Sequence, residues 1–401
     1  MWKLVVLGVL LLLIALFALL FVINGAAAAV KAISHADKSR APLRMRHNGI
    51  LLLASALLCA FFTAVTQWTA STPSIRDERG NAVAGSIAKL TRVELNGRQE
   101  WITLRGQDTT KPVLLFLAGG PGGTQMGAAR QELKELEKHF VVVNWDQPGS
   151  GKSYAAVPRK ELTPDTYVED GIALTQYLLT VFPQEKIYLA GESWGSALAI
   201  FMARERPELY HAVIGTAQMV AFEETERIDY ALAMELAEKA GDDGLVKALQ
   251  KNGPPPYYSK DVTLKSGAYL NYLSGIMASN PEIHNAGYNT FRDIASDEYG
   301  VWDEINFVRG VVNTFSHVYP QLYPVDLRRD CAVLQVPVYF FLGKHDVNAP
   351  LSLAQAYYDA LDAPHKEIVW FEHSGHSPWI NERDKFVQEL VRIANDGAAD
   401  E

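Results

Sequence analysis

A chain of 401 residues with 48% hydrophobic content can bury a large core, which argues against a disordered protein. Its formal net charge is −9, but the first 68 residues hold six basic residues and one acid, so residues 69–401 carry −14. A domain with that charge repels a phosphate backbone, which excludes nucleic acid as an expected partner. Cys59 and Cys331 are the only cysteines, and they offer no disulfide framework.

The chain opens with two apolar stretches, Leu4–Val30 and Ile50–Trp68. Each is long enough to cross a hydrocarbon layer about 30 Å thick, so we predict two transmembrane helices, 4–30 and 50–68, that form a membrane hairpin over residues 1–68. Short basic loops stay on the cytoplasmic side of a membrane. The folded domain after Trp68 is therefore expected on the extracytoplasmic side. The loop residues behind this prediction are Lys31, Lys38, Arg40, Arg44 and Arg46 against a single acid, Asp37.

Two other interpretations of this region stay open. The first stretch, with Lys3 before it and alanines 26–29 after it, also fits a cleaved signal peptide, which would send the large domain inward. Translation from Met45 would make the second stretch a signal or an anchor and would again export the domain.

After a linker, residues 69–82, the sequence alternates between short apolar runs and amphipathic helices. The stretch RVELNGRQEWITLRG predicts a hairpin that turns at Asn96-Gly97. The runs KPVLLFLAGG, FVVVNWD and EKIYLAG predict buried parallel strands, with helices over 127–138 and 164–181. This alternation predicts a mostly parallel sheet with helices on both faces.

Residues 217–327 interrupt the alternation with helix-forming and aromatic-rich segments. The alternation returns with the strands VPVYFFLG and KEIVWF and with helices over 350–362 and 382–395. We therefore predict one α/β core, residues 83–216 and 328–401, with residues 217–327 inserted as a helical cap over its active face.

The segment LAGESWGSALAI places Ser193 between Gly191 and Gly195, where the predicted strand meets a predicted helix. Small neighbours permit a tight turn that lifts the serine above the sheet. The pattern G-x-S-x-G recurs by chance, and a serine at this position can also cap the helix, so the placement is the stronger evidence. A serine nucleophile needs a base that is oriented by an acid, and on this scaffold the chain order is Ser, Asp, His.

Asp346 directly follows one strand and His376 follows the next, and active sites of open α/β sheets collect at these strand ends. We therefore predict Ser193, Asp346 and His376 as a catalytic triad. His373 and His345 compete with His376 for the role of base.

Stabilising a tetrahedral intermediate needs two amide donors. Trp194, directly after the nucleophile, supplies one. The loop AGGPGG, residues 118–123, follows an earlier strand, and its glycines let the backbone approach a substrate closely.

The motifs GGPGG, WDQPGSGKS, GESWGS, GKHD and SGHS occur together in this order, and the chain thereby resembles α/β-hydrolases of the prolyl aminopeptidase (proline iminopeptidase) type. The resemblance covers about 90–217 and 330–395 and leaves out the cap. It implies an α/β-hydrolase fold. It also implies Ser193 as nucleophile, Asp346 as acid, His376 as base, and Gly120 with Trp194 as oxyanion-hole donors.

The sequence departs from the family pattern in three places. Ala118 stands where the family commonly has histidine, and Pro148 stands where it commonly has arginine. The tryptophan-rich cap motif ending in glutamate, which helps the family hold a substrate amine, is not found. An aminopeptidase needs a carboxylate near the amine, although a solvated helix face is the favoured interpretation for each available acid. The candidates are Glu304 in VWDEIN, Glu223, Glu224 and Glu226.

Other readings of the motifs are disfavoured. GSGKS, residues 149–153, lacks the earlier glycine of a phosphate loop, since that position is Asp146, so no nucleotide is expected. The ten histidines include no H-E-x-x-H and the cysteines no pair, so we expect no metal and no cofactor. Glu192, next to the nucleophile, is expected to point away from the cleft and to have a structural role.

The reaction we expect is acyl transfer through an acyl-enzyme, on a short peptide or an ester. The favoured function is an aminopeptidase of prolyl type that releases N-terminal residues. The alternative is a membrane-anchored esterase or lipase-like carboxylic-ester hydrolase. A non-catalytic binding protein on a hydrolase scaffold is a remote third, because no member of the triad is missing.

Overall fold

The computed structural model describes residues 2–34, 40–258, 261–285 and 287–399. They fall into two compact units, one of residues 1–71 with 294–305 and one of residues 72–293 with 306–401. Residues 294–305, which we place in the cap from the sequence, therefore group with the N-terminal segment. Asp37 and Lys38 of the basic loop lie outside the described residues.

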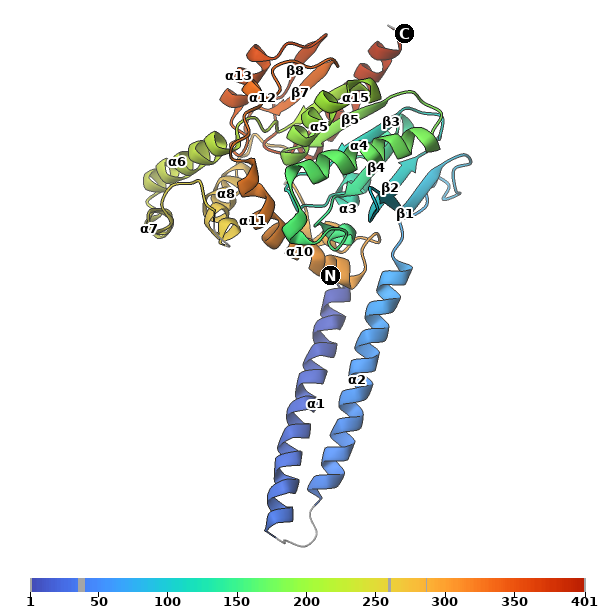
Figure 1. Ribbon diagram of the computed structural model, residues 1–401, viewed down its shortest axis with the longest axis vertical. Helices are drawn as coiled ribbons and strands as arrows, with labels where there is room; N and C mark the ends of the chain where they lie inside the picture. Colours follow the sequence, from blue (N-terminus) through green and yellow to red (C-terminus); the bar gives the residue numbers. More distant parts are fainter. Residues whose placement is uncertain (1, 35–39, 259–260, 286, 400–401) are drawn as a thin grey trace. The chain divides into compact units, whose positions relative to one another are not determined.

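The first unit is built on two long apolar helices, α1 (Trp2–Ile33) and α2 (Ala41–Thr69), which run side by side (Figure 1). Their most apolar windows reach mean hydropathies of 3.4 and 2.2, and only 6% and 11% of those windows are buried. Leucines that stay exposed on a helix need another apolar environment, which a bilayer provides. By length and composition both helices are candidate membrane spans.

Residues 294–305 bind the ends of both helices within this unit. Lys3 at the start of α1 donates to the carbonyl oxygen of Ser296 at 3.0 Å and lies 3.2 Å from the buried carboxylate of Glu304. Near the end of α2, the Gln67 amide donates to Asp303 Oδ1 at 3.0 Å. The segment is thus held to the two helices by hydrogen bonds and an ion pair.

The second unit contains an eight-stranded sheet in the order β1-β2-β4-β3-β5-β6-β7-β8. The β1/β2 and β2/β4 pairs are antiparallel, and all later pairs are parallel. The predicted mostly parallel sheet is thereby confirmed. The strands are β1 (Ile87–Leu95), β2 (Arg98–Gly106), β3 (Val113–Leu117), β4 (Val141–Asp146), β5 (Ile187–Glu192), β6 (Tyr210–Thr216), β7 (Val338–Gly343) and β8 (Lys366–Phe371).

Helices cover both faces of this sheet, as the sequence predicts (Figure 1). Alternate side chains of β3 show the cause: Leu115 packs in a cluster with helices α4, α5 and α13, while Leu114 packs in a second cluster with α3, α14 and α15. Such continuously apolar strands are stable only between two layers. The helices are α3 (Met126–Glu132), α4 (Pro164–Val181), α5 (Trp194–Glu205), α13 (Leu351–Ala360), α14 (Pro378–Asn381) and α15 (Arg383–Ala399).

Two local predictions hold in detail. Asn96 and Gly97 turn the β1/β2 hairpin with φ of 50° and 80°, the positive values of a type I′ turn. Helix α4 begins at Pro164 after the capping box of Thr163 and Thr166. The helix expected over 127–138 instead breaks after α3 and continues as a short 3₁₀ segment, η1 (Lys134–Lys138).

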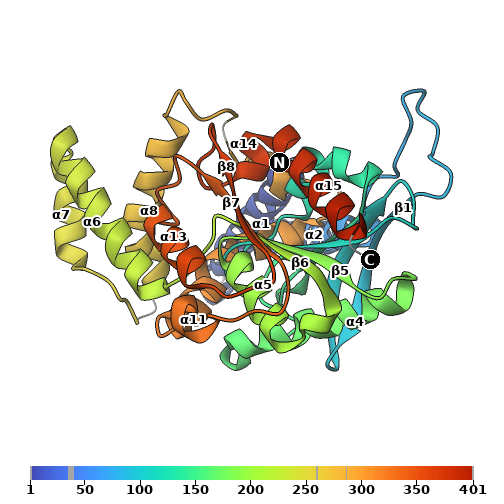
Figure 2. The same cartoon turned by 90° about the horizontal axis from the view of Figure 1, so that it is seen from above.

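The stretch between β6 and β7 is helical, as expected. Helices α6, α7 and α8 lie together beyond the sheet (Figure 2) and share a small apolar cluster that includes Ala233, Leu249 and Leu273. The helices here are α6 (Phe222–Ala240), α7 (Asp243–Asn252), α8 (Val262–Ala278), α9 (Thr290–Ile294), α10 (Val301–Arg309), α11 (Phe315–Val318) and α12 (Leu327–Asp330), with a π-helical turn at Gly310–Thr314.

The segment that follows α2 is packed against the sheet. The buried guanidinium of Arg105 in β2 pairs with the buried carboxylate of Glu137 at 2.6 Å. It also donates to the hydroxyl of Thr72 and the carbonyl oxygen of Pro73, both at 2.6 Å. One side chain therefore joins the segment after α2, the sheet and the η1 turn.

We expect Arg105→Met to lower the free energy of unfolding by about 3–5 kcal/mol, because it leaves the carboxylate of Glu137 buried without its cation. The matched control is Lys239→Met, which removes an exposed cation from its pair with Glu235 and should cost about 1 kcal/mol or less. Urea unfolding of both variants measures the two losses in free energy of unfolding. Equal losses would show that the buried pair of Arg105 and Glu137 stabilises the fold no more than an exposed pair does.

Candidate active site

The turn after β5 gives Ser193 an unusual backbone conformation, with φ 54° and ψ −122°. Its two flanking glycines are required by sterics. A Cβ on Gly191 would lie 2.1 Å from the carbonyl oxygen of Gly195, and a Cβ on Gly195 would lie 2.4 Å from that of Leu117. The serine is thus held at the strand–helix junction with its side chain lining a cavity of about 310 Å³.

Asp346 and His376 meet as the sequence predicts. His376 Nδ1 lies 3.0 Å from Asp346 Oδ2 and 3.1 Å from Oδ1. The Asp346 carboxylate is buried, and its Oδ1 also accepts hydrogen bonds from the backbone N–H groups of Asn348 and Ala349 at 2.8 and 3.0 Å. His376 lines the same cavity as Ser193, so the structure brings the three predicted residues to one place.

The two competing histidines bind elsewhere. His345 Nε2 lies 3.1 Å from the carbonyl oxygen of Glu372 and 3.3 Å from the carboxylate of Glu282. His373 stacks on His284 with the ring centroids 4.0 Å apart. The contacts with Asp346 therefore favour His376 as the base.

The pKa of His376 is raised from 6.5 to about 8. Burial of the ring lowers the pKa, but the charge of Asp346, its hydrogen bond and the charge of Glu192 together outweigh burial. Protonation of His376 therefore stabilises the folded chain below pH 6.5, and that contribution is lost as the pH rises through about 8.

Glu192 holds the histidine loop in place. Its Oε1 accepts hydrogen bonds from the Ser377 hydroxyl at 2.7 Å and from the Trp379 indole at 2.8 Å, and its Oε2 accepts one from the Tyr288 hydroxyl. The structural role matches the prediction, but the predicted orientation does not, because Glu192 forms part of the cavity wall.

The glycine-rich loop after β3 lies on the other side of the serine. Gly119 and Gly120 line the cavity, and Gly120 has a φ of 131°, which favours glycine. Trp194 is the first residue of α5, so its N–H belongs to the turn whose amides have no intrahelical acceptor. Gly120 thus lines the cavity and Trp194 directly follows Ser193, and their role as the two amide donors stays a prediction.

One of the two departures near this loop, Ala118, has a structural account in Gln147. Its amide donates to the carbonyl oxygen of Ala118 at 3.0 Å, and its Oε1 accepts from the Trp194 indole at 3.0 Å. The Gln147 side chain thus ties the glycine-rich loop to the helix of the nucleophile, and the bond to Ala118 uses only backbone. Nothing in the structure explains Pro148 at its position.

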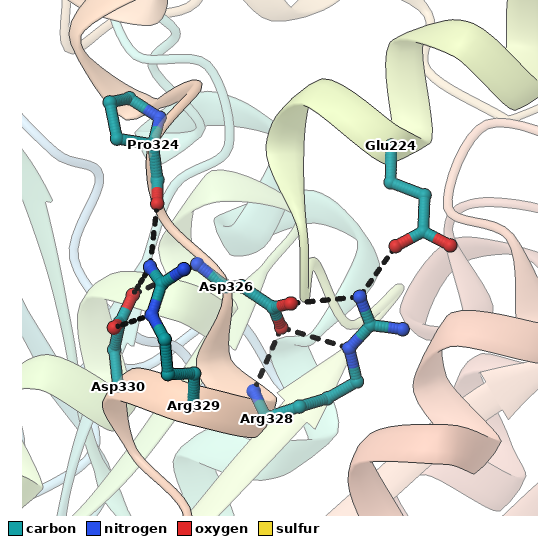
Figure 3. A network of polar contacts seen from close by, with 6 residues as sticks. All are labelled: Glu224, Pro324, Asp326, Arg328, Arg329 and Asp330. Atoms are coloured by element: carbon teal, nitrogen blue, oxygen red, sulfur yellow. Dashed lines mark hydrogen bonds and ion pairs between the residues drawn. The ribbon is translucent and has the colours of Figure 1, made fainter.

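The predicted amine-binding acids lie elsewhere. Glu223 is paired with Arg227, and Glu224 with Arg328, which also binds Asp326 (Figure 3). Glu304 pairs with Lys3 in the first unit. Glu226 is buried and accepts hydrogen bonds from Ser266, Tyr269 and Tyr319. None of these four carboxylates is among the described residues that line the cavity of Ser193.

Sequence reasoning missed Asp293, an acid in the cavity wall. Its Oδ1 accepts a hydrogen bond from Arg292 at 2.7 Å, while Oδ2 is buried and has no hydrogen-bond partner among the described residues. Burial raises the pKa of this carboxyl despite Arg292. The arginine is shared with Glu132 at 2.7 Å. Asp293 lies in a short helix, α9, without apolar periodicity, so no sequence pattern marked it.

A second missed acid is Asp229, which is fully buried in α6. Neither of its carboxylate oxygens has a hydrogen-bond partner within the described part of the chain. Burial, together with the charges of Glu226 and Asp346, raises its pKa well above the usual range. In the ranges that the structure describes, no group of three His, Cys, Asp or Glu side chains is arranged to hold a metal ion.

Comparisons with known proteins agree with this geometry. A family model of the alpha/beta hydrolase fold matches residues 112–252. The "Probable aminopeptidase YbaC" of Bacillus subtilis is 33% identical over 318 residues, which cover 77% of this chain and 97% of that protein. The chain belongs to the α/β-hydrolase family.

Two further relatives of this α/β-hydrolase are proline iminopeptidases or related to them. A proline iminopeptidase of Clostridioides difficile is 25% identical over 310 residues, covering 75% of this chain and 95% of its own. The structure of a proline iminopeptidase-related protein from Thermus thermophilus superposes with a TM-score of 0.55 at 21% identity, covering 77% and 97% of the two chains. The second likeness shows a shared fold. The α/β-hydrolase therefore resembles the proline iminopeptidases.

We expect His376 to titrate near pH 8 and Asp346→Asn to bring its pKa below 6.5, because burial, which is the largest influence, then outweighs the remaining charge of Glu192. NMR titration of ¹³C-histidine-labelled protein measures both values. The other histidines serve as internal controls whose titration should not move. An unchanged His376 pKa in the variant would show that Asp346 does not set it.

Proposed function

We propose that this α/β-hydrolase is a serine aminopeptidase of the prolyl type, which releases N-terminal residues from short peptides. One observation carries the proposal: the cavity that holds Ser193 and His376 also holds the half-paired carboxylate of Asp293. A nucleophile, a base and a carboxylate that can bind an ammonium group are thus available to one small substrate. The aminopeptidase and proline iminopeptidase names of the relatives support the same conclusion.

In the proposed reaction, His376 takes the proton of the Ser193 hydroxyl as its oxygen attacks the carbonyl carbon of the first peptide bond. Asp346 holds the ring through Nδ1 and stabilises the imidazolium that forms. The oxyanion is bound by the N–H groups of Gly120 and Trp194. The leaving amine takes the proton from His376, and water then hydrolyses the acyl-enzyme by the same steps.

The substrate amine binds to Asp293 in this proposal. Arg292 pairs with both Asp293 and Glu132, and Glu132 also pairs with Arg383 at 3.5 Å. Glu192 is a second acid in the wall of the same cavity. An ammonium group in the cavity therefore meets two acids and a buried oxygen that lacks a partner among the described residues.

A small N-terminal residue suits the dimensions of this site. The cavity volume of about 310 Å³ is at the lower end of ligand pockets. The ring of Phe307 offers an apolar wall for a pyrrolidine ring. Tyr288, Asp293 and Phe307 all come from residues 217–327, which supports the proposal that this stretch acts as the cap.

The test is hydrolysis by the full chain in detergent of proline arylamide, other aminoacyl arylamides, an amine-blocked proline arylamide and short-chain aryl esters. We expect the free-amine proline substrate to be cleaved fastest and blocking to abolish cleavage. Ser193→Ala should reduce kcat by at least about 10⁴-fold, because the variant lacks the hydroxyl that forms the acyl-enzyme. Unchanged hydrolysis in that variant would exclude Ser193 as the nucleophile.

Asp293→Asn separates amine recognition from the chemistry. It should lower kcat/KM for proline arylamide about 10- to 100-fold, which corresponds to the free energy of a hydrogen bond to a charged group. Hydrolysis of an aryl acetate, which has no amine, should stay unchanged. The matched control is Asp359→Asn, which removes an exposed carboxylate that contacts Gln355. An equal loss on both substrates would point to a structural role for Asp293.

A second candidate function is a membrane-anchored carboxylic-ester hydrolase. A pimeloyl-[acyl-carrier protein] methyl ester esterase of Pseudoalteromonas atlantica is 24% identical over 269 residues. The same nucleophile and oxyanion hole would act on an ester, and no amine would be needed. Cleavage of the aryl esters without any amide cleavage would establish this function in place of the aminopeptidase.

We also propose that α1 and α2 span the membrane and leave the catalytic unit on the extracytoplasmic side, because Lys31, Arg40, Arg44 and Arg46 lie near their connection. A C-terminal alkaline phosphatase fusion, which needs disulfides to fold, should be active and a C-terminal GFP fusion dark. GFP fused after Ser34 is the control and should fluoresce. A fluorescent C-terminal GFP would place the catalytic unit in the cytoplasm.

A further inference from the structure

His376 stands between two cavities. The first, described above, holds Ser193, and the second, of about 370 Å³, lies on the other side of the histidine. His376, Tyr288 and Thr290 line both cavities, so they form the wall that the two share. A substrate that reaches from one cavity into the other passes the ring that moves the proton.

The direction of proton transfer decides what each cavity holds. The acyl part of the substrate stays bonded to Ser193 after the first step, so it occupies the first cavity with the oxyanion donors and Asp293. The leaving amine departs from the same carbon and takes its proton from His376. The leaving half therefore lies on the histidine side, where the second cavity opens.

Apart from His376, whose charge is paired with Asp346, the second cavity has no cationic side chain among its described lining residues. Apolar side chains come from α8 and the loop after it: Met277, Ala278 and Ile283. Asn285, Asn348 and Asn381 add neutral polar groups. A group that enters this cavity finds hydrogen-bond partners and apolar surface but no counter-ion for a carboxylate.

Carboxylates lie directly behind two of its walls. Ser377 donates to Glu192 at 2.7 Å, and His376 is bonded to Asp346 at 3.0 Å. A third acid, Glu282, lies 3.3 Å from His345 in the neighbouring loop. The negative potential of these groups opposes an anion in the cavity.

We propose that the second cavity receives the leaving half of the substrate and selects an uncharged leaving amine over one that carries a carboxylate. The preferred substrate is then an amide-capped dipeptide or a longer peptide, in which the second residue has no free carboxylate, and free dipeptides are poor substrates. This inference rests on the proposed function, because it assumes acyl transfer with His376 as the proton donor.

The test compares kcat/KM for prolyl-leucinamide and prolyl-leucine. The full-length protein should prefer the amide by at least about tenfold. Because the two amines also differ as leaving groups, the decisive quantity is the change of this ratio in Ala278→Lys. Ala278 is exposed in the last turn of α8, where a lysine is compatible with the helix dipole, and its cation would reach the cavity.

We expect Ala278→Lys to lower the amide preference at least about fivefold, mainly through a gain on the free dipeptide. The matched control is Leu264→Lys, the same change at an exposed position of α8 outside the cavity, and it should leave the ratio unchanged. Ser274→Lys, at a second lining position, should act like Ala278→Lys. A ratio that is the same in wild type and both lining variants would overturn the proposal.

The outcome for proline arylamide keeps the two proposals apart. If the arylamide is cleaved and the ratio does not respond to the lining lysines, the leaving-group proposal fails and the aminopeptidase stands. If no amide is cleaved but esters are, the aminopeptidase fails, and acetate esters of 4-hydroxybenzamide and 4-hydroxybenzoate then test the cavity with the same variants. An unchanged ratio on those esters would also overturn the proposal.

Discussion

The close approach of two backbone segments at the turn after β5 is the constraint on which the site depends. A Cβ on Gly191 would collide with the carbonyl oxygen of Gly195, and a Cβ on Gly195 would collide with that of Leu117 at the end of β3. This contact forces Ser193 into a left-handed φ and turns the chain from the central strand into α5. The parallel sheet on both sides then brings the ends of β3, β7 and β8 to the same edge, with their loops around the serine.

Buried carboxylates dominate the electrostatics around that serine, and each has a different role. Asp346 is hydrogen-bonded to the ring of His376 and raises its pKa. Glu192 accepts hydrogen bonds from the loop that follows the histidine and holds that loop in place. Asp293 lines the cavity and has a buried carboxylate oxygen without a hydrogen-bond partner among the described residues. A site with so much negative charge is suited to a cationic acyl group and unsuited to an anionic leaving group. The proposed preference for a free N-terminal amine and the proposed preference against a free carboxyl end thus have one electrostatic origin.

The residues of the N-terminal hairpin and the segment 294–305 form one unit. Within it Glu304 makes a structural ion pair, whereas its motif suggests that it binds the substrate amine. The sequence VWDEIN places this acid in a helical stretch between β6 and β7, and a resemblance to substrate-binding caps makes it a candidate for the amine. The structure pairs it with Lys3 instead, across a separation of about 300 residues in the chain. Asp293, which belongs to the other unit, has a carboxylate oxygen without a hydrogen-bond partner among the described residues.

The sequence by itself determined the α/β architecture, the hairpin at Asn96-Gly97, the elbow at Ser193 and the positions of Asp346 and His376 at strand ends. These features depend on local signals, namely apolar periodicity, glycine spacing and turn residues, and a parallel sheet brings strand ends together without further information. Only the tertiary structure decided which acids face the cavity. Whether Asp293, Glu226 or Glu304 finds a partner depends on side chains far away in the chain, and burial and charge at such contacts leave no periodic pattern in the sequence.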